Sequence, residues 1–267
     1  MMTGRSGPGT SSWTTCVPDP FPLIEREPVD VTGLASEMWQ LLGRIDDRFP
    51  GGWVLVGGQM VLLLGLEHEQ LPRRETIDAN ALINVKVMPD GTARVSRFLQ
   101  AEGLELAGIA VDGQGHRFVG RGLAVDVLAP DNIGTRAALT TVAPARTVKV
   151  PAGTRLLRSP RRCPVRAGDA VIAVPRPDLD AAIVGKAAAM SLPHPTRHGE
   201  DLAFLCGLVV DPRVIEARLT RSDRRWLTGA RGLLDDRRVW RHAADPSAAR
   251  STLRFLLAGS SHSGEAR

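Results

Sequence analysis

Hydrophobic residues near the start of the chain follow first a helical and then a strand period. Between residues 31 and 48 they recur every three or four positions, which predicts an amphipathic helix. The members of this stripe are Leu34, Met38, Leu41, Leu42 and Ile45. The uninterrupted apolar run at residues 53–56 predicts a short buried strand, which turns at Gly57-Gly58 into a second helix over residues 59–66.

The next part of the chain alternates strand patterns with one helix. Strands are expected at residues 77–87, 104–110, 117–119 and 123–128, and a helix over 94–102 ends before Gly103. Strands with helices between them predict an α/β or α+β fold, in which helices flank a mixed sheet that ends near residue 130.

The second half of the chain changes from short strands to helices. Short strands between Pro and Gly turns predict a hairpin over residues 147–174, and Asp178 is the expected N-cap of a helix over 179–190. Helical patterns continue at 198–209 and, with breaks, at 212–257. The predicted organisation is a disordered tail at 1–22, an α/β domain at 23–145, a β-hairpin extension or linker at 146–176, a helical C-terminal region at 177–258 and a disordered tail at 259–267.

Composition and charge narrow the function classes. Three widely spaced cysteines without a Cys-x-x-Cys pair predict neither a disulfide framework nor a zinc knuckle. The longest apolar run, at 54–66, is broken and too short to span a bilayer, so we expect a cytoplasmic protein with no membrane partner. The net charge of +5 is concentrated at residues 155–166 and 213–241, which are typical either of a solvated surface or of a contact with tRNA or another nucleic acid.

Three positions have the pattern of a metal site. Magnesium prefers carboxylate oxygens, and residues at i and i+2 of one strand share a face. Asp78 and Asn80 have this spacing, and Asp126 lies in an otherwise apolar strand, where a carboxylate is costly unless it is paired or binds a cation. The alternative for Asp126 is an exposed strand end at a sheet edge. The Gly57-Gly58 turn could let backbone N–H groups approach a phosphate.

The pattern Gly-Gly followed by Arg-x-Thr-x-Asp-x-Asn resembles minimal nucleotidyltransferases of bacterial toxin–antitoxin systems, and in particular the AbiEii-type toxin family. The resemblance implies an enzyme that uses Mg²⁺ and an NTP and has an antitoxin partner. It implies that Gly57 and Gly58 hold phosphates and that Asp78 and Asp126 bind the metal. It assigns the lead-in positions of that motif to Arg74 and Thr76.

A second part of the resemblance lies in the predicted helices after residue 177. There the family has an inward Lys and then an Arg and an acidic pair, which match Lys186, Arg197, Glu200 and Asp201. Lys186 lies in line with the apolar stripe of its helix, which is uncommon unless the ammonium meets a partner. It is predicted either to act in the site or to form a structural ion pair with Asp201.

Asn80 is the departure from the family pattern, because the family has a second acid there. An amide oxygen can bind magnesium but lacks the charge that holds two cations, and an amide cannot act as the base. Three hypotheses follow: weak nucleotidyl transfer with one metal held by Asp78 and Asp126, binding of nucleotide or nucleic acid without turnover, or a protein-binding scaffold.

Overall fold

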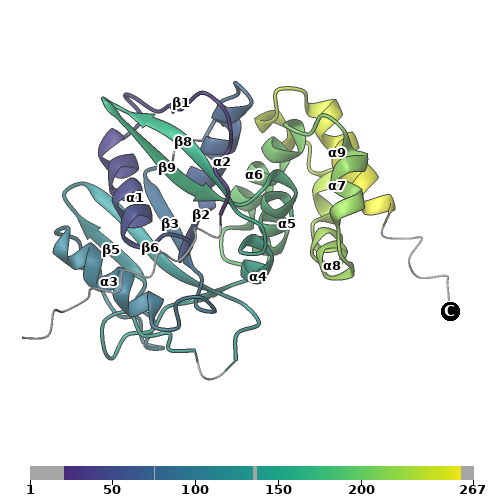
Figure 1. Cartoon of the computed structure of the whole chain (residues 1–267). Coiled ribbons are helices and arrows are strands. Elements are labelled where there is room, and N and C mark those ends of the chain that lie inside the picture. The colour runs from purple at the N-terminus through teal and green to yellow at the C-terminus, as the bar shows by residue number, and fades with distance from the viewer. Residues whose placement is uncertain (1–20, 75, 135–136, 260–267) are drawn as a thin grey trace, which may run out of the picture.

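The computed structural model describes residues 21–74, 76–134 and 137–259 and has the mixed α/β architecture predicted from the sequence (Figure 1). The predicted tails, except for residues 21, 22 and 259, and Glu75 of the Arg-x-Thr motif lie outside the described residues. Helices flank mixed sheets, and the C-terminal part is helical, so the predicted fold class is confirmed.

The larger sheet forms the floor of the candidate site. Its order is β2-β3-β6-β5-β4, with β7 paired to β6. β3 and β6 run parallel, whereas β2 is antiparallel to β3 and β5 is antiparallel to β6. The bounds are β2 (Trp53–Val56), β3 (Asp78–Ile83), β4 (Glu105–Leu106), β5 (Arg117–Gly120), β6 (Leu123–Pro130) and β7 (Lys149–Val150). Since β3 and β6 are neighbours in the middle of the order, their polar residues meet inside the sheet.

Three helices belong to this first part of the chain, namely α1 (Ser36–Arg48), α2 (Gly57–Glu67) and α3 (Gly91–Ala101). The expected start of the first helix at residue 31 was wrong by five residues. Val29 and Asp30 form the short strand β1, and Gly33 has a positive φ of 84°, so the chain enters α1 only after a turn. Strand pairing with a distant segment overrode the local pattern.

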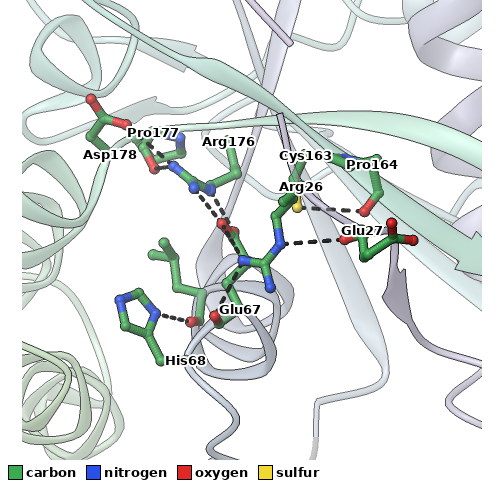
Figure 2. Close-up of polar contacts among 10 residues, drawn as sticks. Arg26, Glu27, Glu67, His68, Cys163, Pro164, Arg176, Pro177 and Asp178 are labelled. Carbon is green, nitrogen blue, oxygen red and sulfur yellow. Dashed lines mark hydrogen bonds and ion pairs between the residues drawn. The ribbon is translucent and has the colours of Figure 1, made fainter. Parts of the chain in front are cut away.

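The hairpin of β8 (Arg161–Ala167) and β9 (Ala170–Arg176) joins β1 in a second, three-stranded sheet. This sheet packs closely on α1, because a Cβ on Gly43 would lie 2.7 Å from Cγ2 of Ile172. Buried ion pairs add to the packing. Arg176 lies 2.6 Å from Glu67 at the end of α2, which Arg26 also reaches (Figure 2).

The remaining helices begin with α5 and α6, which lie between the sheets and the last helices (Figure 1). Their bounds are α4 (Gly153–Leu156), α5 (Leu179–Ala189), α6 (Pro195–Gly207), α7 (Pro212–Arg218), α8 (Arg221–Gly229), η1 (Arg231–Asp235), η2 (Val239–His242) and α9 (Pro246–Ala258). Asp178 stands at the N-cap of α5, but its carboxylate accepts a hydrogen bond from Arg176 instead of capping the helix. In the described part of the chain, no helix combines the length and the apolar character needed to cross a membrane.

Candidate functional site

Ten of the residues that the sequence proposed for a site line one cleft of about 960 Å³, whereas Glu200 of the acidic pair does not line it and lies 3.5 Å from His242. The cleft lies where β3 and β6 meet the start of α2 and the facing helices α5 and α6. The predicted residues among its lining come from five separate stretches of the chain. The predicted residues that it gathers are Gly57, Gly58, Arg74, Thr76, Asp78, Asn80, Asp126, Lys186, Arg197 and Asp201.

The Gly57-Gly58 turn is required by the close approach of β3. Gly57 has a φ of 76°, and a Cβ there would lie 2.3 Å from Nδ2 of Asn80. A Cβ on Gly58 would lie 2.6 Å from Oγ1 of Thr76. No side chain of the described residues caps the N-terminus of α2. The first N–H groups of a helix have no intrahelical partner, so this uncapped end at the cleft is suited to an anion.

The two acids of the predicted metal site meet across parallel strands. Asn80 lies opposite Asp126, and Asp78 is two residues earlier on β3. Because β6 is an interior strand and Asp126 is only 9% exposed, the alternative of an exposed sheet edge is wrong. Burial raises the pKa of Asp126. The positive charges of Arg117 and His116 oppose this rise, and the negative charge of Asp78 adds to it. Oγ1 of Thr76 donates to Oδ1 of Asp78 at 3.1 Å and orients it.

Arg117, which the sequence analysis missed, joins the two acids. It lies opposite Asp126 on β5, and its Nη1 donates to Oδ2 of Asp78 at 3.4 Å. The same atom donates to Oδ1 and Oδ2 of Asp126 at 3.5 and 3.4 Å. The register of the β5–β6 hairpin places Arg117 opposite Asp126, and the pairing of β6 with β3 brings it within reach of Asp78.

The opposite wall of the cleft carries a buried charge cluster. Nζ of Lys186 donates to Oδ2 of Asp201 at 2.6 Å, and both side chains are at most 6% exposed. Nη2 of Arg74 donates to Oδ1 and Oδ2 of Asp201 at 3.2 and 3.1 Å. The predicted ion pair of Lys186 with Asp201 is therefore present, on a wall of the cleft. Arg197 lines the cleft and has no ion pair among the described residues.

His198 lines the cleft, although the sequence analysis did not propose it for the site. His194 is the N-cap of α6, and it lines the cleft together with His198. Nδ1 of His198 is buried and has no hydrogen-bond partner in the described structure. Burial lowers the pKa of His198 to about 4, with further lowering from Lys186 and Arg74 that Asp201 opposes. The imidazole is therefore neutral at neutral pH.

The donor set of the acids fits one divalent cation. Asp78 and Asp126 converge on a single point, which is now held by Nη1 of Arg117, and the amide of Asn80 lies beside them. Within the described ranges, no group of three or more His, Cys, Asp or Glu residues could hold a metal. Two carboxylates and an amide match a single Mg²⁺ better than the two cations that three acids support.

The overall charge of the cleft favours anions. The acidic residues that line it are Asp78, Asp112, Asp126 and Asp201, and the basic ones are Arg74, Arg146, Lys149, Lys186 and Arg197.

No protein-family model matches this chain, and no curated protein sequence matches it.

Proposed function

We propose that the cleft binds a nucleoside triphosphate and transfers its nucleotidyl group to an acceptor hydroxyl, as the resemblance to AbiEii-type nucleotidyltransferases implies. The observation that supports this function is that the predicted phosphate turn, the predicted acids and the predicted Lys and Arg line one cleft. A volume of about 960 Å³ suits a ligand of nucleotide size.

In this proposal different walls of the cleft bind different parts of the nucleotide. The N–H groups at Gly57 and Gly58 bind phosphate oxygens at the uncapped start of α2. Lys186 and Arg74 both contact the single carboxylate of Asp201, so this wall keeps a positive charge. The guanidinium of Arg197, which has no ion pair among the described residues, binds the outer phosphates.

Asp78 and Asp126, with the amide oxygen of Asn80, would hold Mg²⁺. When bound, the ion would supply positive charge that offsets the charge developing on the phosphoryl oxygens. The acceptor oxygen forms a bond to the α-phosphorus while the bond to the pyrophosphate oxygen breaks. The hydroxyl proton passes to a carboxylate, since the amide of Asn80 cannot accept it.

The acceptor proposed here is tRNA or another nucleic acid, and a second hollow of about 560 Å³ supports it. This hollow shares Lys149 and Val150 with the cleft and is also lined by Arg158, Arg225 and Trp226. Phosphates would meet the two arginines, and a base can stack on the indole. Arg155 does not contribute a free charge, because it is paired with Asp180 and Asp223. A protein antitoxin stays a prediction of the resemblance.

Asn80 and the contact of Arg117 with both acids favour a second candidate, a nucleotide-binding module without turnover. Both features reduce the negative charge that would hold a catalytic cation. The second candidate keeps the phosphate turn and the basic wall and loses only the chemistry.

Two measurements test these functions. Labelled NTPs with Mg²⁺ or Mn²⁺ and bulk tRNA should give weak label transfer that Asp78→Asn and Asp126→Asn abolish. Equilibrium binding of a fluorescent NTP should weaken in Gly57→Ala. Binding without transfer selects the module, and a lack of both binding and transfer overturns both candidates. In a low-salt gel shift, Arg225→Gln together with Trp226→Ala should reduce tRNA binding, and unchanged binding removes this acceptor surface.

A further inference from the structure

We propose that Arg117 is a built-in cation at the two acids of the cleft, which holds Asp78 and Asp126 in place of a divalent metal and weakens metal binding there. The inference deepens the proposed function, on which it rests for the identity of the site. The binding of a metal ion to the protein alone can nevertheless be measured without any nucleotide.

The position of Nη1 is the first support. One nitrogen lies 3.4 Å from Oδ2 of Asp78 and 3.4 and 3.5 Å from the two oxygens of Asp126. Three carboxylate oxygens from two strands therefore surround a single positively charged atom. A cation that used both acids as ligands would need this same space.

Strand register explains how the guanidinium reaches both acids. Arg117 on β5 is paired directly with Asp126 on β6, and directly opposed residues of antiparallel strands project to the same face. β3 lies on the other side of β6, with Asn80 paired to Asp126. The side chain of Arg117 thus passes over β6 to reach Asp78.

The contact is loose compared with the structural ion pairs of this protein. The pairs of Lys186 with Asp201 and of Arg176 with Glu67 are 2.6 Å long, with side chains at most 7% exposed. Arg117 is 44% exposed, and its contacts are 3.4 to 3.5 Å long, beyond the range of about 2.7–2.9 Å for strong charge-assisted bonds. Exposed pairs contribute little to stability, so a structural role does not account for Arg117.

Charge decides the effect on a metal. Asp78 and Asp126 carry two negative charges, Arg117 cancels one of them, and Asn80 adds none. A divalent cation must therefore either displace the guanidinium or bind beside a positive charge, and both weaken its affinity. Arg117 and Asn80 act in the same direction, toward a cleft that binds anions more readily than metals.

The test measures Mn²⁺ binding to the full chain by electron paramagnetic resonance or titration calorimetry, with no nucleotide present. Arg117→Gln should bind Mn²⁺ at least about tenfold more tightly than the wild type, which corresponds to about 1.4 kcal/mol. Arg117→Lys keeps the charge and should stay near the wild type. The gain should disappear in Arg117→Gln combined with Asp78→Asn.

The matched control is Arg121→Gln, because Arg121 lies beyond the end of the same strand and pairs with Glu37 outside the cleft. It should leave Mn²⁺ affinity unchanged. Equal affinity of Arg117→Gln and wild type, with normal thermal unfolding, overturns the proposal. Should Arg117→Gln not fold, Arg117→Met keeps the apolar stem and replaces it. If both fail to fold, the contact is structural and the proposal is wrong.

These outcomes separate the inference from the proposed function. A gain in Mn²⁺ affinity without label transfer in any variant leaves the role of Arg117 standing and removes the transferase. Label transfer by the wild type, together with no change in Mn²⁺ affinity in Arg117→Gln, supports the transferase and removes the proposed role of Arg117.

Discussion

Replacing Lys186 by Met removes the ammonium that lies 2.6 Å from Oδ2 of Asp201, deep in the wall of the cleft. Methionine has a similar length and fills the apolar space along α5, so the change removes chiefly charge and hydrogen bonding. Asp201 is left with Arg74 as its partner, at 3.1 and 3.2 Å.

The expected cost follows from burial. Removing one partner of a buried ion pair costs about 3–5 kcal/mol, because the other charge stays desolvated. Arg74 still compensates Asp201, so we expect the lower end, about 3 kcal/mol. At a urea m-value of about 3 kcal/mol per molar, this loss lowers the unfolding midpoint by about 1 M.

Urea unfolding followed by circular dichroism measures this effect. Lys149→Met is the matched control, because Lys149 lines the same cleft but is exposed, and it should change stability by less than about 0.5 kcal/mol. Combining Lys186→Met with Asp201→Leu should cost less than the sum of the two single changes. A loss below about 1 kcal/mol in Lys186→Met would refute the view that the pair is a buried, mutually dependent unit.

Three further predictions concern the turn, the histidine and the thiols. Gly57→Ala should lower the free energy of unfolding, measured in urea, by at least about 1–2 kcal/mol because residue 57 has a positive φ. The new Cβ would also lie 2.3 Å from Nδ2 of Asn80, so adding Asn80→Ala to the same chain should recover the stability lost to this clash. The lowered pKa of His198, about 4, means that the unfolded chain binds a proton between about pH 6.5 and 4 while the folded chain does not, so stability falls as the pH is lowered through this range. His198→Gln should flatten that fall, and an unchanged slope contradicts the shift. Burial raises the pKa of Cys163 and of Cys206 to about 12, so peptide mapping after iodoacetamide treatment at neutral pH should find both unmodified in the folded protein. Fast labelling of either would show that its segment opens.

The local elements were predictable where packing agrees with the local pattern. The buried strand at residues 53–56 was predicted with its observed bounds, and the helix expected at 179–190 is α5, which ends one residue earlier. The strand expected over 77–87 stops at Ile83. The N–H of Asn84 donates to the carbonyl of Gly52, and Met88 then closes a turn on Asn84. That early end is set by a contact with a neighbouring loop, which a periodicity within one segment does not register.

The candidate site likewise has features that single segments of the sequence predict and features that depend on the packing between segments. The sequence by itself determined the chemistry available: a glycine turn, two acids with Asn80 at the third position, and a Lys in line with an apolar stripe. Residue types and short spacings are properties of single segments, so they can be recognised without knowing the fold. Their convergence in one cleft, by contrast, depends on how the segments pack together.

Only the tertiary structure decided which charges meet. Arg117 reaches Asp78 and Asp126 because β5, β6 and β3 pair in one register, and a shift of one residue would turn Arg117 to the other face of the sheet. The neutral state of His198 depends on burial beside Lys186 and Arg74, which come from distant segments. Electrostatic energy depends on distance in space and on desolvation, and the order of residues along the chain specifies both only through the completed fold.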